Sequence, residues 1–471
     1  MKKYSYYLPL LALGLLAGSC QNLVSDLNIS PNNPQDAPAN VMLTGVQLTD
    51  AIAQEGEGAR LAGLWSGYFE GLLFQYQSHY QYIVIANDFN TPWAYCYSYT
   101  IKNARLMRQK AQAVNNKRLA GVAQVLEANA ASTATDLWGD VPFVQADDDN
   151  YPNPQFEPQR QVYAEVQTLL DSAIVNLNST AFVDFSANDI IAAGNVVRWR
   201  QAAYTLKARN YLHTKEYALA LAAAQNGIST NANSLYFPHL DNTNGSNLYY
   251  QFIVEDKSGY MGVGAFANSL INPTGTRTRA NSKTNEKARY GYLYTSATSL
   301  NTGSVGGAFY KTTGFPMLTY QENLLILAEA DARLNGLTAG LTRLNTYRAY
   351  LATGGYLSTN YIVAANLKYD AYVAADFAAG GIENPTATAI APDRALLREI
   401  LEERYVTFVG QIEGFNDVRR TVKETDIRVP VTPNVGTQLP LRFLYPQSEV
   451  DRNSSTPNPI PGIFVPTPVN M

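Results

Sequence analysis

The segment from Leu119 to Phe143 constrains the possible fold more than any other part of this sequence. From Leu119 to Leu137, apolar and small residues recur every three or four positions, which predicts an amphipathic α-helix of about five turns. Several other positions are alanine, so neighbouring helices can approach closely on more than one side. The helix should end at Gly139, where a positive φ is allowed, because Pro142 cannot continue an α-helix.

Other helical patterns follow in pairs that are joined by short turns. The helix over 97–114 should run antiparallel to the helix over 119–138, with the turn at Asn115 and Asn116. The same periodicity predicts helices over 162–177, 196–213, 217–228, 325–332 and 341–351, and a last long helix from Asp393, its expected N-cap, to Phe408. Short turns between Ala-rich helices resemble degenerate tetratricopeptide units.

Two long stretches interrupt this helical pattern, near residues 229–315 and 354–392. The first is rich in Asn, Ser, Thr, Gly and Tyr, and its run Tyr249 to Val254 is strand-like. The second is punctuated by Gly and Pro, although its middle could be helical. Irregular insertions of this length in a domain are usually functional.

The N-terminus has the features of a secretory signal. Lys2 and Lys3 precede an apolar run of about ten residues, which is too short to span a bilayer but suits a signal peptide. Small residues then precede Cys20, as in the bacterial lipobox. We therefore expect a signal peptide over 1–19 and a lipidated tether over 20–40, anchored at Cys20; an ordinary signal peptide is the alternative. Cys96 would then have no disulfide partner within the chain.

The sequence offers little chemistry. A net charge of −4 without basic tracts argues against nucleic acid as a partner. The three histidines are widely separated and no metal-binding spacing occurs, so we predict no catalytic residue, metal or cofactor. The segment from Gly262 to Ala267 matches a dinucleotide fingerprint only weakly. Seven charged residues favour an ion-paired helix pair over a catalytic cluster: Glu402, Glu403, Arg404, Glu413, Asp417, Arg419 and Arg420.

Four segments carry a family resemblance. Residues 135–143, TDLWGDVPF, resemble the hallmark of SusD/RagB-family lipoproteins, which are surface nutrient-binding proteins of Bacteroidetes. Residues 316–330, 400–420 and 444–449 with Asn453 are similar to other motifs of that family. The resemblance implies a mainly α fold: a right-handed superhelix of degenerate tetratricopeptide-like helix pairs in a single domain, 41–471. The long insertions would cover one side of it and supply much of the ligand-facing surface.

The resemblance also implies a function. Such a protein is lipid-anchored in the outer membrane, facing outward, and is not an enzyme. It captures an oligosaccharide, or in some members a peptide, and delivers it to a SusC/RagA-like TonB-dependent β-barrel transporter. Two alternatives stay open: a surface-anchored glycan hydrolase, which would need two carboxylates in a cleft, and a tetratricopeptide-like scaffold that binds proteins.

The candidate ligand-binding residues lie mainly in the aromatic segment before the first helix pair. Aromatic rings alternate there with Gln, Asn and Ser on a Gly-interrupted stretch, and flat rings can stack on sugars. The stacking candidates are Trp65, Tyr76, Tyr80, Trp93 and Tyr95; the polar candidates beside them are Asn87, Asp88 and Asn90; and the first insertion adds Tyr260 and Arg277.

Overall fold

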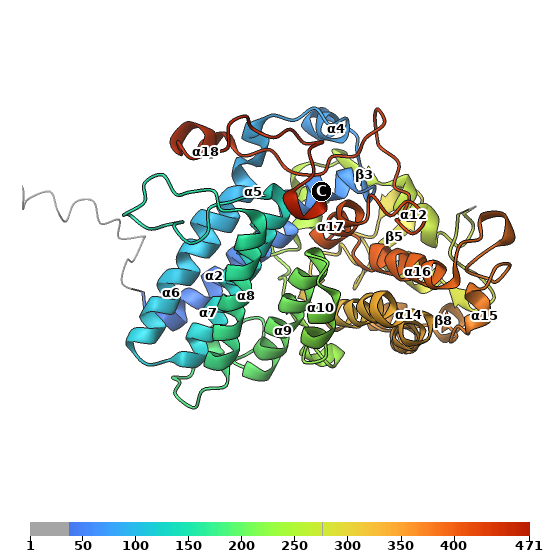
Figure 1. The fold of residues 1–471 in the computed structure, drawn as a ribbon, viewed down its shortest axis with the longest axis horizontal. Coiled ribbons are helices and arrows are strands. Elements are labelled where there is room, and N and C mark those ends of the chain that lie inside the picture. The colour runs from blue at the N-terminus through green and yellow to red at the C-terminus, as the bar shows by residue number, and fades with distance from the viewer. Residues whose placement is uncertain (1–36, 276) are drawn as a thin grey trace, which may run out of the picture.

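Consecutive helices stack side by side in the N-terminal half of the computed structural model, which describes residues 37–275 and 277–471 (Figure 1). They are α6 (Lys102–Ala113), α7 (Lys117–Trp138), α8 (Gln159–Leu177), α9 (Val196–His213) and α10 (Tyr217–Ala224). Each packs against the next, and α2 (Ala39–Glu55) packs on α6 and α7. The helix pairs expected from the sequence are therefore confirmed. The expected signal peptide, Cys20 and most of the tether lie outside the described residues.

Helix α7 is the centre of this stack, and only its first two residues are not buried. A Cβ added at Gly121 would come within 2.8 Å of Leu177 Cγ, so the close crossing of α7 and α8 requires glycine there. At the other end Gly139 has a φ of 85°, as expected for the helix exit. The Trp138 indole Nε1 then donates to the Leu444 carbonyl oxygen at 2.7 Å, which ties the corner to the C-terminal segment.

The C-terminal half adds two longer helices and two shorter ones. They are α14 (Tyr320–Ala352), α16 (Pro392–Thr407), α17 (Ile412–Arg420) and α18 (Gln447–Arg452). Two helices merge in α14 across Gly336, whose φ is 75°, so the predicted pair there is confirmed. The expected N-cap of α16 was wrong. Ala391 is the N-cap and Pro392 is already helical, because proline has no N–H to lose in the first turn.

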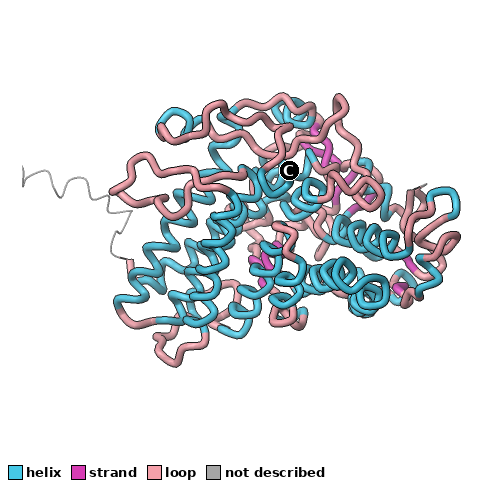
Figure 2. The backbone as a smooth tube through the Cα atoms, in the orientation of Figure 1, coloured by secondary structure: helices cyan, strands magenta, loops and turns pink. Residues whose placement is uncertain are grey.

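Short elements and loops make up the two insertions and much of the C-terminal segment; Figure 2 shows several of these loops along the upper edge, above the stacked helices. The short helices are α3 (Glu57–Trp65), α4 (Phe74–Tyr80), α5 (Asn90–Ala94), α11 (Leu248–Tyr250), α12 (Ala265–Ile271), α13 (Lys287–Leu293) and α15 (Ala374–Phe377). Single 3-10 or π turns are η1 (Ala86–Phe89), η2 (Tyr95–Ile101), η3 (Ser186–Asn188), η4 (Asn231–Asn233), η5 (Gln251–Asp256), η6 (Thr359–Tyr361), η7 (Ala364–Asn366), η8 (Thr386–Thr388) and η9 (Pro468–Asn470).

The strands form small antiparallel pairs. These are β1 (Phe69–Gly71) with β3 (Met261–Val263), β2 (Leu235–Phe237) with β7 (Phe315–Leu318), β4 (Thr284–Asn285) with β8 (Lys368–Tyr369), and β5 (Tyr294–Ser296) with β6 (Ser299–Leu300). The strand-like run from Tyr249 to Val254 is helical instead, in α11 and η5. The Asn247 side chain accepts from the backbone N–H groups of Tyr249 and Tyr250, and this cap outweighs the β-propensity of the residues that follow.

The predicted fold class is confirmed: the chain is mainly α, with stacked helix pairs and long irregular insertions. One hydrophobic core runs through most of the described residues. A second, smaller apolar cluster joins α9 and α10 to α14, and its buried members are Ala208, Leu212, Ala220, Ala223, Ala224, Ile326, Leu327 and Ala330. Within the described ranges no helix is both long and apolar enough to cross a membrane.

Candidate functional site

A surface cavity of about 470 Å³ lies beside α4, where three distant segments of the chain meet. Its wall combines aromatic rings, hydroxyl and amide groups, and one guanidinium. The lining residues are Gly67 and Phe69 near β1, Tyr80 at the end of α4, Gly264, Ala265, Phe266 and Ser269 from the start of α12, Arg277, and Thr432, Pro433 and Asn434. We call this the α4 cavity. It contains two of the residues predicted from the sequence, Tyr80 and Arg277.

The backbone of the α4 cavity is held by strand pairing and by glycine. Strands β1 and β3 pair so that Phe69 lies opposite Val263. Next to them, a Cβ on Gly264 would come within 2.2 Å of the Gly67 carbonyl oxygen, so only glycine permits this approach. The Asn434 side chain donates to the Tyr80 carbonyl oxygen at 3.0 Å and fastens the C-terminal loop to α4.

The side chains of the α4 cavity are suited to a flat polar ligand. Tyr80 is half-buried, and burial, with a further effect of Glu70, raises the pKa of its hydroxyl, which therefore stays protonated and can donate. The Phe266 ring packs edge-on against Tyr405, at 5.7 Å between centroids, which fixes its orientation. The Arg277 guanidinium is exposed and lies 6.0 Å from the centroid of Phe266. Rings for stacking and donors for oxygen atoms thus share one wall.

Exposed apolar side chains lie at both ends of α4, and we call them the α4 patch. Its members are Leu72, Leu73, Phe74, Ile83 and Ile85. The Phe74 side chain is 71% exposed, stands near the Tyr260 ring at 5.1 Å between centroids, and has a φ of 50°. A bulky residue with positive φ is strained, and such strain is concentrated at functional sites. The α4 patch is therefore a candidate contact surface for a ligand or a partner.

Three of the predicted stacking residues are buried in the core, which corrects the sequence analysis. Trp65, Tyr76 and Trp93 are 0%, 1% and 4% exposed. The Trp65 indole donates to the His79 carbonyl oxygen at 2.9 Å, and the Tyr76 hydroxyl accepts from Arg60 Nε at 2.8 Å. Their polar atoms are thus satisfied inside the protein, so we do not retain these rings as ligand contacts.

Trp65 is surrounded by rings that come from distant parts of the sequence: Tyr82, Phe89, Phe415 and Phe443. Trp93 stacks on Tyr97 at 4.4 Å between centroids. Trp93 is 4% exposed and also lines a second surface cavity, of about 470 Å³, together with Asn90. These contacts are typical of core packing.

The remaining predicted residues are spread over the surface near η1, η2 and η5. Tyr95 is half-buried and contacts Tyr99. Asn87 is exposed and accepts from Asn90, whose own side chain caps the N–H of Ser448 at 3.0 Å. Asp88 caps Ile85 and lies 3.4 Å from His79 Nε2. The Tyr260 ring lies beside Phe74 of the α4 patch. The structure therefore does not bring these residues into the α4 cavity.

Sequence reasoning missed Phe266, Ser269, Thr432 and Asn434, which complete the α4 cavity. A signal for the first two was present in the glycines around Val263. These glycines match a nucleotide fingerprint only weakly, and in the structure they allow close backbone approach in an antiparallel strand pair. Nothing in the local sequence indicates that the loop at 432–434 reaches α4.

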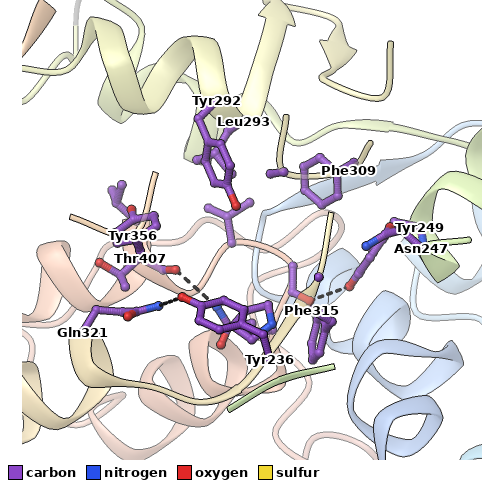
Figure 3. Close-up of a pocket in the computed structure, with 17 residues that line it drawn as sticks. Tyr236, Asn247, Tyr249, Tyr292, Leu293, Phe309, Phe315, Gln321, Tyr356 and Thr407 are labelled. Atoms are coloured by element: carbon purple, nitrogen blue, oxygen red, sulfur yellow. Dashed lines mark hydrogen bonds between the residues drawn. The ribbon is translucent and has the colours of Figure 1, made fainter. Parts of the chain in front are cut away.

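An interior pocket is too small for a sugar. Figure 3 shows it between Tyr236, Tyr249, Tyr292 and Phe309, where Gln321 Nε2 donates to the Tyr236 hydroxyl at 2.9 Å. Its volume of about 40 Å³ corresponds to a few water molecules, on the order of one per 10–15 Å³. We therefore assign it no ligand.

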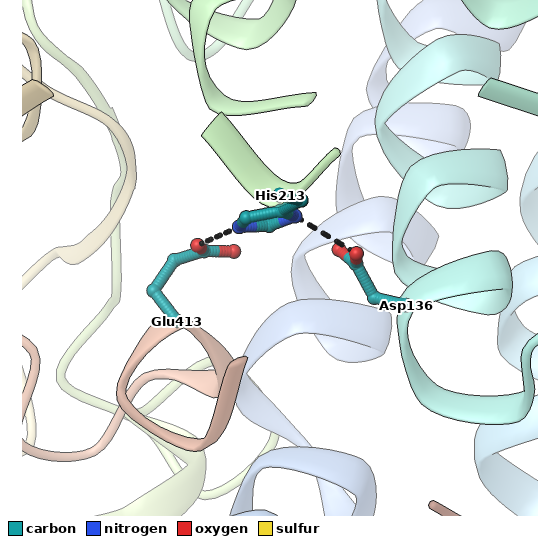
Figure 4. Close-up of side chains that lie close together, drawn as sticks. All are labelled: Asp136, His213 and Glu413. Atoms are coloured by element: carbon teal, nitrogen blue, oxygen red, sulfur yellow. Dashed lines mark hydrogen bonds and ion pairs between the residues drawn. The ribbon is translucent and has the colours of Figure 1, made fainter. Parts of the chain in front are cut away.

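A buried group of charges joins the motifs that carried the family resemblance. We call it the central charge cluster; its members are Asp136, Arg209, His213, Glu322, Glu329, Glu413, Arg404, Asp417 and Arg420. The His213 ring lies between two carboxylates, with Nδ1 2.8 Å from Asp136 and Nε2 3.0 Å from Glu413 (Figure 4). Because the two ring nitrogens face different carboxylates, the arrangement fits an imidazolium better than a ligand set for one metal ion.

The electrostatics of the central charge cluster indicate that its role is structural. Burial alone would lower the pKa of His213, but Asp136 and Glu413 outweigh it and raise the pKa to about 9. Burial would likewise raise the pKa of Glu413, yet Arg209 and His213 hold it well below its usual range. Arg420 binds Glu329 through two bonds of 2.6 Å. The sequence interpretation as an ion-paired helix pair is confirmed for Arg404, Asp417 and Arg420. Glu413 pairs instead with His213 of α9. Glu402 and Glu403 pair with arginines of the first insertion, and Arg419 donates to backbone oxygens and to Asn416.

The stacked helix pairs define a helical-repeat protein. Its loops form a surface cavity that is lined with aromatic rings and is large enough for a small ligand. The chain belongs to the SusD-like family: the family model described as "Starch-binding associating with outer membrane" matches residues 31–446. No curated protein sequence gives a significant match.

Solved structures of the same family share this fold. A SusD/RagB family protein from Bacteroides thetaiotaomicron is 21% identical, with a TM-score of 0.66 over 89% of this chain and 95% of its own. A chitin-binding SusD homologue from Flavobacterium johnsoniae is 16% identical, with a TM-score of 0.66 over 91% and 97%. A SusD homologue from Parabacteroides distasonis is 18% identical, with a TM-score of 0.64 over 91% and 96%. At these identities the likeness concerns the fold alone.

Proposed function

We propose that this protein is a cell-surface lipoprotein that captures an oligosaccharide and delivers it to a TonB-dependent transporter of the outer membrane. The observation that carries the proposal is the α4 cavity. Tyr80 and Phe266 supply aromatic rings there, and Ser269, Thr432 and Arg277 supply polar groups around them. Aromatic faces take the apolar side of a sugar while hydroxyl and guanidinium groups bind its oxygens.

Two comparisons support a glycan as the ligand. The matching family model is described as starch-binding, and one of the similar solved structures is a chitin-binding protein. A cavity of about 470 Å³ also falls within the range of about 300–1,000 Å³ that is usual for small-ligand sites. It can hold a short stretch of an oligosaccharide, with the rest extending over the α4 patch.

The side chains that line the α4 cavity favour binding over hydrolysis. Glycoside hydrolysis ordinarily uses two carboxylates, about 5–10 Å apart, that flank the scissile bond. The side chains that line this cavity are aromatic, hydroxyl, amide and guanidinium groups. The carboxylates of the central charge cluster, such as Glu329 and Asp417, are instead committed to buried ion pairs with arginine.

Delivery to a transporter would use the α4 patch. Phe74, Ile83 and Ile85 are 71%, 62% and 62% exposed, and exposed apolar patches mark contact surfaces. The lipid on Cys20 would hold the protein at the outer membrane, with the tether leading to α2 at Ala39. One acyl chain binds a membrane only marginally, so several chains are expected.

Titration calorimetry of the purified protein with starch-derived and chitin-derived oligosaccharides tests capture. We expect binding to at least one series and recovery of the sugar at its original length by chromatography. Shortened products would favour the hydrolase instead.

Co-purification from detergent-solubilised outer membranes tests the partner, and recovery of the protein alone would count against delivery. Cys20→Ala should release a folded protein from the membrane fraction in a strain without the transporter, and its retention there would contradict the anchor.

A further inference from the structure

Among the described residues, the side chains that line the α4 cavity carry only positive charge. Arg277 is the one charged side chain among the described residues that line it. The chain as a whole carries a net charge of −4, so a positive wall is not a consequence of overall composition. Glu70 is near enough to Tyr80 to affect the pKa of its hydroxyl, but it does not line the cavity. A cation in a concave wall raises the local concentration of anionic ligands.

Arg277 differs from its neighbour Arg279 in how its guanidinium is used. The Arg279 side chain is 5% exposed, and its Nη2 donates to Glu399 at 2.7 Å and to Glu403 at 2.9 Å. Arg277 is exposed, and its guanidinium lies over the ring of Phe266. Arg279 therefore stabilises the fold, whereas the donors of Arg277 face solvent at the cavity.

The position of Arg277 also suits a particular ligand shape. A guanidinium binds a carboxylate or a sulfate through two parallel hydrogen bonds, which fixes the orientation of the group as well as its charge. The rings of Phe266 and Tyr80 lie in the same wall and can take the face of the sugar that carries that group. A neutral sugar would use the rings and hydroxyls but leave the guanidinium to water.

We propose that the α4 cavity selects oligosaccharides that carry an acidic group, with Arg277 binding that group while Phe266 and Tyr80 hold the sugar ring. This inference rests on the proposed function and names the ligand class of the same cavity. The acidic group is either a uronate carboxylate or a sulfate ester, and the test separates the two.

Matched pairs of probes test the selectivity by titration calorimetry. Polygalacturonate oligosaccharides are compared with their methyl esters, and κ-carrageenan oligosaccharides with the same oligosaccharides after desulfation. We expect at least about a tenfold preference for the acidic member of one pair, as a bidentate charged contact would give. Preference in the first pair identifies a carboxylate, and preference in the second identifies a sulfate. Equal or weaker binding of both acidic probes would overturn the proposal.

Two variants separate a specific contact from general charge. Arg277→Gln should abolish the preference for the acidic probe, while Arg160→Gln, which removes an exposed charge on α8, should keep it. Loss in both variants, or in neither, would overturn the role of Arg277. Binding of neutral starch or chitin oligosaccharides without any acidic preference would refute this inference but leave the proposed function intact. Failure of every glycan probe would refute both.

Discussion

The central charge cluster and the α4 cavity both collect polar residues from distant parts of the chain, but they use them in opposite ways. In the cluster each charge faces an opposite charge: Arg420 binds Glu329 and Asp417, and His213 lies between two carboxylates. In the cavity the Arg277 guanidinium faces solvent. The strong sequence motifs thus come from the central charge cluster, which holds the fold together. The residues of the α4 cavity form only weak motifs.

This contrast explains why motif residues are poor guides to the binding site. A buried charge is costly unless it is paired, so the residues of the cluster depend on one another and form a recognisable pattern. A surface that binds a ligand needs only a few rings and donors in the right places, and many residues can supply them. The following experiments compare the two regions, from the largest expected effect to the smallest.

Arg420→Met should have the largest effect on stability. It leaves Glu329 and Asp417 without their closest cation in the interior, and breaking a buried ion pair costs about 3–5 kcal/mol. Urea unfolding should show this loss, while ligand affinity at a temperature where the variant is folded should be nearly unchanged. Arg160→Met on the surface of α8 is the control and should change little. A neutral effect of Arg420→Met would mean that the cluster does not stabilise the fold.

Trp93→Ala should also lower stability, by about 3–5 kcal/mol, because it removes a buried ring that stacks on Tyr97 and packs on Trp138. Thermal melting measures the loss and calorimetry measures the affinity. An intact affinity is expected, since Trp93 is 4% exposed and lies outside the α4 cavity. A large drop in affinity with unchanged melting would move the binding site to the second cavity, which this ring borders.

His213 gives the central charge cluster a pH dependence. Its pKa rises from an unfolded value of about 6.5 to about 9 in the folded protein, so its protonated form adds stability that is fully present below pH 6.5 and is lost as pH rises through 9. The gap in unfolding free energy between the wild type and His213→Gln should therefore shrink by up to about 3 kcal/mol over this window. A gap that is constant from pH 6 to pH 10 would show that His213 is not charged in the fold.

Tyr80→Ala should have the smallest effect on stability and the clearest effect on binding. Loss of one stacking ring costs about 1–3 kcal/mol of ligand affinity, taking base stacking as the nearest analogue. Tyr80 is half-buried, so the melting temperature should fall less than for Trp93→Ala. Tyr151→Ala removes an exposed tyrosine far along the chain and is the matched control. Lower melting with intact affinity would mean that Tyr80 is a packing residue.

The sequence by itself determined the helical architecture. Periodicity and small residues predicted α7, and Gly139 and Pro142 predicted its end, because these effects act within a few residues of the chain. The ion-paired reading of Asp417 and Arg420 was also possible from sequence, since neighbours three positions apart meet on one helix face. Where a single local contact overrode propensity, as with the Asn247 cap that makes the following run helical, the prediction failed.

Only the tertiary structure decided which aromatic residues face a ligand. Trp65 and Tyr80 belong to the same aromatic segment, yet Phe415 and Phe443 cover Trp65 from the C-terminal segment, whereas Tyr80 lies beside a cavity. The wall of that cavity is completed by Arg277 and by a loop more than 350 residues from Tyr80. The exposure of a side chain depends on contacts between segments far apart in the chain, and no local pattern contains them.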